Sequence, residues 1–124
     1  MPSINKKVLI VEDDEDFVFI LEKKFTTEGF TVVTAKDGEN GVVVAEKEKP
    51  DLILSDMLMP KMDGVTMATK IRTFDANVPI MFLTNIKDAD RSSDTKIPAG
   101  IDYIIKADTR IDEIVQKAKT KLGV

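Results

Sequence analysis

The chain has 124 residues, of which 43% are hydrophobic and 32% charged, and its formal net charge is −4. Its length fits one compact domain, and its composition is that of a soluble globular protein without an apolar run long enough to cross a bilayer. The absence of cysteine and histidine excludes disulfides, thiolate metal sites and cysteine nucleophiles, and it removes the commonest general base. Because Lys and Arg are scattered along the chain, there is little reason to expect direct nucleic-acid binding.

Five short apolar runs, taken in chain order, predict five β-strands at residues 8–11, 30–33, 52–54, 80–83 and 103–105. Each run is continuously apolar and does not alternate with polar residues. This pattern is typical of strands that are buried on both faces of a parallel sheet.

The segments between these runs carry the apolar spacing of amphipathic helices. Two apolar stripes are each followed by a glycine, a residue suited to ending a helix. The first stripe, before Gly29, consists of Phe17, Ile20, Leu21 and Phe25. The second, before Gly123, consists of Ile111, Ile114, Val115, Ala118 and Leu122. Asp37 and Thr109 are predicted N-caps, because each offers a side-chain oxygen to an unpaired helical N–H.

One of the predicted helices, between Thr84 and Ile101, is weakly encoded. This segment has few strong helix formers and contains Pro98, which does not fit inside a continuing helix. We predict a short or mobile fourth helix there. Strands that alternate with helices imply right-handed crossovers and a parallel sheet covered on both faces, so the expected fold is an open three-layer α/β domain.

Polar residues follow four of the predicted strands, and in an open parallel sheet the ligand crevice lies at these carboxyl ends. Glu12 and Asp13 follow the first strand, Asp56 the third, Thr84 the fourth and Lys106 the fifth. Three carboxylates from two strand ends repel one another unless a cation lies among them. Oxygen ligands without nitrogen or sulfur suit Mg²⁺. We therefore predict a Mg²⁺ site with Asp13 and Asp56 as direct ligands and Glu12 acting directly or through water.

A plainer interpretation exists for each of these acidic residues. Residues 12–16 are also typical of an acidic first helical turn, which stabilises a helix through its dipole. This interpretation applies above all to Asp14, Glu15 and Asp16. Asp56 also reads as an isolated turn aspartate, although it closes a hydrophobic strand and is not placed to cap a helix.

Four sequence blocks resemble the signature blocks of response regulator receiver domains: residues 7–14, 51–64, 79–84 and 100–106. Together they span nearly the whole chain, and they occur in the family's order at the predicted strand ends. The resemblance implies a flavodoxin-like, doubly wound sheet with the strand order 2-1-3-4-5. We expect a single receiver domain over residues 1–124.

The resemblance also implies the role of each site residue. Asp56 would be the nucleophile that forms an aspartyl phosphate, and Glu12, Asp13, Asp56 and the backbone carbonyl of Leu58 would hold Mg²⁺. Thr84 and Lys106 would hold the phosphoryl oxygens. Phosphoryl transfer depends mainly on charge neutralisation and positioning, so these few groups suffice without histidine.

The same resemblance implies a switch in which Thr84 moves toward the phosphate and Tyr103 turns inward. Phosphorylation adds roughly 1.5 to 2 negative charges, enough to favour a second arrangement of the nearby loop. Plainer interpretations are a solvated strand end for Lys106, a strand-end hydroxyl for Thr84 and an edge aromatic for Tyr103.

Three positions depart from the family pattern or bear on the rate of the reaction. Ala107 follows Lys106 where the family usually has proline, often in a cis peptide, so we predict a trans bond or a rearranged loop. Asn85 stands where a small residue is usual. Leu58 and Ile86 are apolar and flank the site by resemblance, so we hypothesise that they hinder the attacking water and prolong the phosphoryl state.

We predict a phosphoacceptor switch with at most autophosphorylation and autodephosphorylation activity. Its expected partners are a histidine kinase or phosphotransfer protein and an unknown downstream protein, with no membrane or direct nucleic-acid partner. It would be a monomer or a weak phosphorylation-dependent dimer. The polar segment at residues 1–7 is too short for a signal peptide, so we expect a cytoplasmic protein.

Three rival functions fit the sequence less well than this prediction. A turnover phosphatase would need a second acid where this chain has Leu58. A flavin carrier would need a phosphate-friendly loop where this chain has the acidic residues 12–16, whose charge repels such a cofactor. A degenerate receiver that binds partners without phosphorylation is the strongest alternative, although Asp13, Asp56, Thr84 and Lys106 argue against it.

Overall fold

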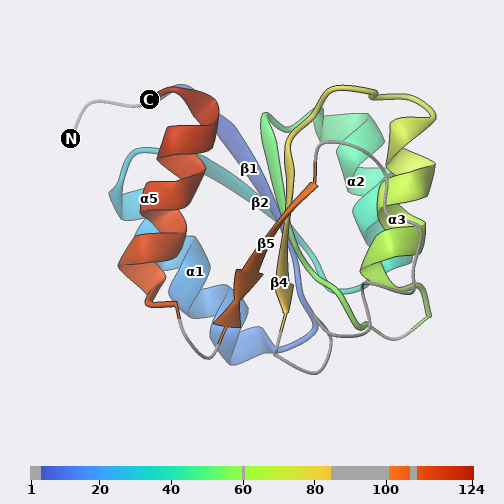
Figure 1. Cartoon of the computed structure of the whole chain (residues 1–124), viewed down its shortest axis with the longest axis horizontal. Helices are drawn as coiled ribbons and strands as arrows, with labels where there is room; N and C mark the ends of the chain where they lie inside the picture. Colours follow the sequence, from blue (N-terminus) through green and yellow to red (C-terminus); the bar gives the residue numbers. More distant parts are fainter. Residues whose placement is uncertain (1–3, 60, 85–100, 107–108) are drawn as a thin grey trace.

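The computed structural model describes residues 4–59, 61–84, 101–106 and 109–124 (Figure 1). It contains one sheet of five strands, in which every neighbouring pair is parallel and the order is β2-β1-β3-β4-β5. The strands are β1 (Lys7–Val11), β2 (Thr31–Ala35), β3 (Leu52–Asp56), β4 (Ile80–Thr84) and β5 (Ile101–Ile105). The predicted fold class and strand order are confirmed.

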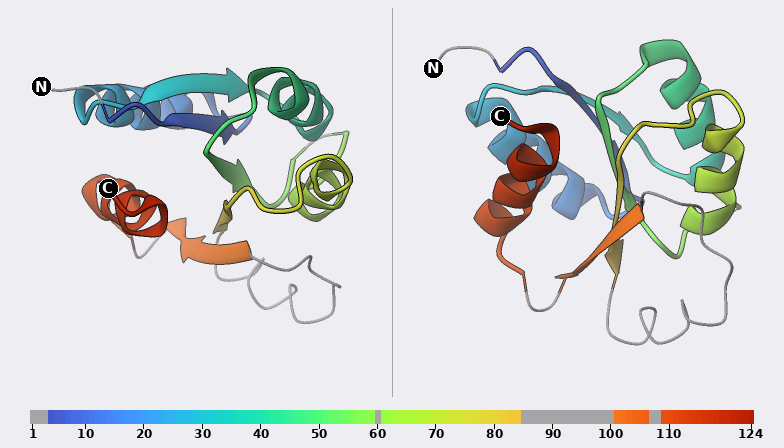
Figure 2. Two further views of the ribbon diagram at one scale, coloured as in Figure 1. Left: turned by 90° about the horizontal axis from the view of Figure 1, so that it is seen from above. Right: turned by 45° about the horizontal axis from the view of Figure 1, so that its top comes forward.

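Helices cover both faces of the sheet, as Figures 1 and 2 show. On one face lie α1 (Glu15–Thr27) and α5 (Ile111–Leu122), and on the other lie α2 (Gly38–Glu48) and α3 (Gly64–Arg72). The fourth helix predicted between Thr84 and Ile101 falls on residues 85–100, which lie outside the described residues. Within the described ranges, no helix combines the length and the hydropathy that crossing a membrane requires.

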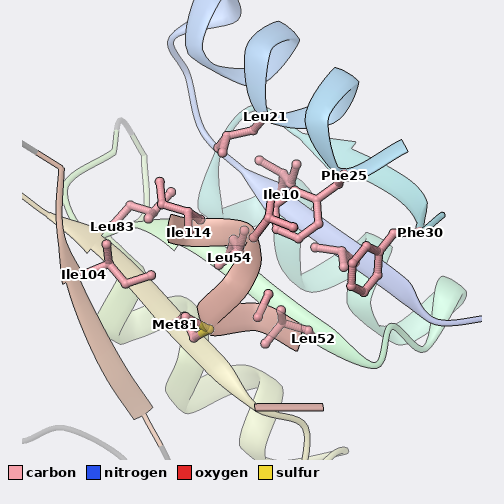
Figure 3. Packing of buried hydrophobic residues seen from close by; sticks show 13 residues of the cluster. Ile10, Leu21, Phe25, Phe30, Leu52, Leu54, Met81, Leu83, Ile104 and Ile114 are labelled. Atoms are coloured by element: carbon pink, nitrogen blue, oxygen red, sulfur yellow. The ribbon is translucent and has the colours of Figure 1, made fainter. Parts of the chain in front are cut away.

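The central strands are buried on both faces, which explains their continuously apolar sequences. Under α1 and α5, side chains from β1, β3 and β4 pack with Leu21, Phe25 and Phe30 (Figure 3), and the two phenylalanine rings meet edge to face at 5.2 Å. A second cluster under α2 and α3 includes Met67 and Phe82. Two packed layers of this kind hold the carboxyl ends of the central strands in fixed positions.

Three of the four predicted helix-end residues behave as expected. Asp37 caps α2, accepting a hydrogen bond from the Asn40 N–H at 2.8 Å, and this bond lowers the pKa of Asp37. Gly29 and Gly123 have φ values of 101° and 72°, the left-handed conformation that ends a helix.

The predicted N-cap at Thr109 was wrong, because α5 begins one residue later than that prediction requires. Arg110 is the N-cap residue, and it makes no side-chain capping bond. Its carbonyl accepts the first helical hydrogen bond, from the Ile114 N–H at 3.0 Å. Ile114, Val115 and Ala118 are the buried residues of α5, and their burial stabilises the helix without a side-chain cap, which contributes only roughly 1 kcal/mol.

Candidate functional site

The carboxyl ends of β1, β3, β4 and β5 lie at one edge of the sheet. The pairing sets Val11 opposite Ser55, Asp56 opposite Leu83, and Thr84 opposite Ile105. The residues that follow these positions therefore meet at the same edge, although they are far apart in sequence.

Three carboxylates form the centre of this edge. Glu12, Asp13 and Asp56 each offer one carboxylate oxygen, and these oxygens all lie within 4.8 Å of one another. Glu12 is buried, Asp56 is partly buried and Asp13 is exposed. A cluster made only of hard oxygen donors and open to solvent on one side fits a Mg²⁺ ion that keeps several waters.

Lys106 reaches this cluster from the end of β5. Its ammonium donates to Glu12 Oε1 at 2.5 Å and lies 3.7 Å from Asp56 Oδ2. It also lies 4.6 Å from the centre of the Phe17 ring on α1. Of the groups predicted for the site, Glu12, Asp13, Asp56 and Lys106 are thus brought together.

The charges in this cluster shift one another's protonation. Burial raises the pKa of Glu12 to about 7; the Lys106 hydrogen bond opposes this rise and the neighbouring Asp56 adds to it. Burial alone would lower the pKa of Lys106, but the hydrogen bond with Glu12 and the charge of Asp56 outweigh it, so that pKa is raised. Three acids facing one lysine leave the site attractive to a further cation.

The backbone around Asp56 is held by short hydrogen bonds and close packing. The Met57 N–H donates to Asp56 Oδ1 at 2.8 Å, which leaves Oδ2 facing Lys106. The Ser55 hydroxyl donates to the Asp56 carbonyl at 2.8 Å. At Gly64, a Cβ atom would come within 2.7 Å of that carbonyl oxygen, so only glycine fits beside it.

The other predicted site residues are Thr84, Tyr103 and Leu58. Thr84 is fully buried at the end of β4. The Tyr103 ring packs against Phe82 at 5.8 Å, and its hydroxyl is buried without a hydrogen-bond partner among the described residues. Leu58 is 49% exposed. The predictions for Asn85, Ile86 and the Lys106–Ala107 bond involve residues outside the described ranges.

The acidic residues after Asp13 belong to the helix start, as the plainer interpretation held. Asp14 is the N-cap of α1 and accepts from the N–H groups of Asp16 and Phe17 at 3.1 and 3.3 Å. Glu15 and Asp16 occupy the first helical turn, where negative charge is favourable. Of residues 12–16, only Glu12 and Asp13 belong to the carboxylate cluster.

Phe17 is the site residue that sequence reasoning missed. Its spacing with Leu21 and Phe25 assigned it to the core-facing stripe of α1, and it does pack against that core. Its second contact, with Lys106, joins residues 89 positions apart (106 − 17) and leaves no trace in local sequence. The only available signal in the sequence was the position of Phe17 about one helical turn after Glu12 and Asp13.

Comparison with known proteins agrees with this geometry. A family model for the response regulator receiver domain matches residues 8–119. The sporulation initiation phosphotransferase F of Bacillus subtilis is 30% identical over 119 residues, covering 96% of this chain and 95% of that protein. The alkaline phosphatase synthesis transcriptional regulatory protein PhoP of the same species is 38% identical over 104 residues, covering 83% of this chain but only 43% of PhoP. The chain therefore spans about half the length of the transcriptional regulators that it matches.

Among solved structures, the receiver domain of the sensor histidine kinase PA1611 from Pseudomonas aeruginosa superposes with a TM-score of 0.82 and 27% identity, covering 96% of this chain and 98% of that one. That structure holds a magnesium ion coordinated in its active site cleft. The receiver domain of the hybrid histidine kinase CckA gives a TM-score of 0.79 and 26% identity, covering 94% and 98% of the two chains.

Proposed function

The chain belongs to the response regulator receiver family of two-component systems, and on this premise we propose that it is a phosphoacceptor switch, one receiver domain over residues 1–124, that takes a phosphoryl group on Asp56. The observation that carries the proposal is the meeting of Glu12, Asp13 and Asp56 with Lys106 at one sheet edge. In such a pocket Lys106 would neutralise phosphoryl charge on one side, and a metal ion held by the carboxylates would neutralise it on the other.

In the proposed step, a carboxylate oxygen of Asp56 attacks the phosphorus of a partner's phosphohistidine. One O–P bond forms and the P–N bond breaks, and the imidazole nitrogen leaves with the bonding electron pair and takes up one proton. No general base on this chain is needed, because the attacking oxygen belongs to a carboxylate and not to a hydroxyl that must first lose a proton. The product is an acyl phosphate on Asp56 and a free histidine on the donor.

The residues that would hold Mg²⁺ are Glu12, Asp13, Asp56 and the backbone carbonyl of Leu58. The bound ion would neutralise charge on the phosphoryl oxygens. Asp13 is exposed and Glu12 is buried, so Asp13 is the ligand that an ion meets first from solvent. Lys106 would leave Glu12 and pair with a phosphoryl oxygen, a shift that its long side chain permits.

Phosphorylation would then act on the end of β4 through Thr84. The hydroxyl of Thr84 would donate to a phosphoryl oxygen. The side chain of Tyr103, on β5, would then turn inward. Support comes from the burial of Thr84 and of the Tyr103 hydroxyl, with the Tyr103 ring already packed on Phe82. The energy available is that of one or two charge-assisted hydrogen bonds, about 1.5–3 kcal/mol each.

The proposed partners follow from the chemistry of the site. A histidine kinase or phosphotransfer protein would supply the phosphoryl group in the cytoplasm, and a downstream protein would bind the switched surface, with the chain acting as a monomer or as a weak dimer when phosphorylated. At most, the chain would catalyse its own phosphorylation and dephosphorylation. The alternative is a degenerate receiver that binds its partner regardless of phosphorylation.

Intact-mass analysis after incubation with a small acyl phosphate, with and without Mg²⁺, tests the proposal. We expect a single phosphoryl adduct on the parent protein only with Mg²⁺, and no adduct on Asp56→Asn. Asp51→Asn is a matched control, because Asp51 lies at the other end of β3, where it accepts from the Lys7 N–H at 2.8 Å. A parent protein that gives no Mg²⁺-dependent adduct would favour the degenerate alternative.

A further inference from the structure

We propose that Phe17 is a positioning residue that holds the Lys106 ammonium beside Asp56, an inference that rests on the proposed phosphoacceptor function. The Lys106 nitrogen lies 4.6 Å from the centre of the Phe17 ring, well inside the range of a cation–π contact. The same nitrogen lies 2.5 Å from Glu12 Oε1 and 3.7 Å from Asp56 Oδ2. The ammonium is thus held by groups from three separate segments of the chain.

Phe17 is itself firmly placed. Its backbone N–H donates to the Asp14 side chain at 3.3 Å, as part of the N-cap of α1. Its ring packs against the cluster under α1 and α5, which includes Leu21 and Phe25. The helix cap therefore holds the backbone of Phe17, and the core holds its ring.

The ring differs from the two carboxylates in one respect that matters for function. Glu12 is proposed to bind the metal ion, and Asp56 is proposed to bind the metal ion and the phosphoryl group. The interactions of both carboxylates would therefore change when these groups bind. The face of the Phe17 ring carries a constant negative potential and binds neither. If Glu12 bound a metal ion, Phe17 would be the contact that keeps Lys106 within reach of Asp56.

The lysine side chain needs such a fixed contact, because it is long and flexible. Ordering a lysine side chain costs up to about 2 kcal/mol of rotamer entropy. A contact that is present before and after phosphorylation keeps the lysine side chain ordered in both states. Less of this entropy cost is therefore added to the activation free energy of the reaction. The expected effect of Phe17 is accordingly on the rate of phosphorylation.

The chain offers a matched control on the same helix. Phe19 is 64% exposed, and the Lys23 ammonium lies 5.8 Å from the centre of its ring. This second lysine and phenylalanine pair has the same chemistry but does not include Lys106. The substitutions Phe17→Leu and Phe19→Leu therefore remove the same atoms, and only the first removes the contact with Lys106.

The experiment uses the full chain, with Phe17→Leu, Phe17→Tyr and Phe19→Leu beside the parent. In each, NMR records the Lys106 CεH₂ signals with and without Mg²⁺, and the initial rate of phosphorylation by a small acyl phosphate is measured. We expect ring-shifted Lys106 signals in the parent under both conditions, lost in Phe17→Leu and kept in Phe17→Tyr and Phe19→Leu. The rate should fall about fivefold in Phe17→Leu, the scale of a partly desolvated cation–π contact, and stay within about twofold in the other two.

Each contrary result has its own meaning. Lys106 signals that are the same in Phe17→Leu as in the parent would overturn the contact. Signals that shift while the Phe17→Leu rate equals the parent rate would overturn the positioning role alone. A parent that is not phosphorylated at all would overturn the proposed function, and the role of Phe17 in that reaction with it.

Discussion

The Lys106 ammonium donates to Glu12 Oε1 at 2.5 Å, which joins two residues 94 positions apart in sequence. Their strands are not neighbours, because β3 and β4 lie between β1 and β5 in the sheet. The lysine therefore reaches across the ends of two strands to meet Glu12. A cation that binds the carboxylate cluster must compete with this lysine for Glu12. The Lys106 ammonium already places one positive charge beside the three carboxylates.

Millimolar Mg²⁺ should raise the melting temperature of the protein, because an ion that binds only the folded chain stabilises it by mass action. The gain is about 2.7 kcal/mol when the free ion is at 100 times its dissociation constant. Asp13→Ala should remove most of this gain. Differential scanning calorimetry over a series of Mg²⁺ concentrations measures it.

Asp16→Ala is the matched control for that experiment, since Asp16 carries the same charge in the first turn of α1 but lies outside the carboxylate cluster. It should keep the full Mg²⁺ response. Equal loss of the response in both variants would mean that the ion is attracted by the general negative charge of this end of the sheet and not by a defined site.

Leu58→Asn should shorten the lifetime of the phosphorylated form severalfold. Leu58 lies two residues after Asp56 and is 49% exposed, and we expect its apolar side chain to limit the approach of water to the acyl phosphate. An amide would instead orient a water molecule by hydrogen bonding. The decay of the intact-mass adduct after removal of the phosphodonor gives the rate, and an unchanged lifetime would contradict this role.

Gly64→Ala should lower the free energy of unfolding by about 1–3 kcal/mol through overpacking. The new methyl would lie 2.7 Å from the Asp56 carbonyl oxygen and 2.9 Å from the Phe82 ring, and the first of these belongs to the backbone. Urea unfolding measures the loss. Because the backbone of Asp56 must shift, phosphorylation of this variant should also slow.

Gly123→Ala provides the contrast to Gly64→Ala. A methyl there meets nothing within 4 Å, but φ is 72°, so the cost is the left-handed conformation alone, about 1 kcal/mol. This variant should be phosphorylated at the parent rate. Slower phosphorylation of Gly123→Ala would show that the rate follows stability and not the geometry at Asp56.

The ion pair between Glu28 and Lys119 should stabilise the protein at neutral pH and not in acid. Lys119 donates to Glu28 Oε1 at 2.6 Å, and this hydrogen bond lowers the pKa of Glu28 below its usual 4.5. A lowered pKa in the folded state contributes stability above pH 4.5, and this stability is lost as the pH falls through the folded-state value. Glu28→Gln should therefore be less stable than the parent at pH 7 and equal to it at low pH.

Urea unfolding at several pH values tests this prediction, with Glu46→Gln as the control because Glu46 is exposed on α2. Glu46→Gln should follow the parent at every pH. A difference between Glu28→Gln and the parent that persists unchanged into acid would show that packing, and not charge, accounts for the effect.

The central strands and their site residues could be predicted from the sequence for a physical reason. A strand buried on both faces of a parallel sheet is apolar throughout, so the polar residue that follows it marks its end. Glu12, Asp56 and Thr84 stand at such ends. The edge strand β2 is less buried and carries two exposed threonines, so its predicted span of residues 30–33 was shifted from the observed Thr31–Ala35.

Contacts between side chains from distant segments could not be predicted in the same way. The apolar stripe of α1 suggested that Ile20 would be buried, yet it is 49% exposed, because burial depends on which neighbours the fold supplies. The ion pair between Lys106 and Glu12 and the contact between Lys106 and Phe17 arise only when β5 is placed across the sheet from β1. The helix cap assigned to Thr109 was wrong, because the buried residues of α5 stabilise the helix without a side-chain cap at its start, Arg110.

The central claim, that Asp56 accepts the phosphoryl group, is tested most directly by locating the modified residue. Borohydride reduces an acyl phosphate to an alcohol, which converts a phosphorylated aspartate to homoserine, and peptide mass spectrometry then identifies its position. We expect homoserine at position 56 alone, and only in samples phosphorylated in the presence of Mg²⁺. Homoserine at Asp13 or at another carboxylate, with position 56 unchanged, would contradict the claim.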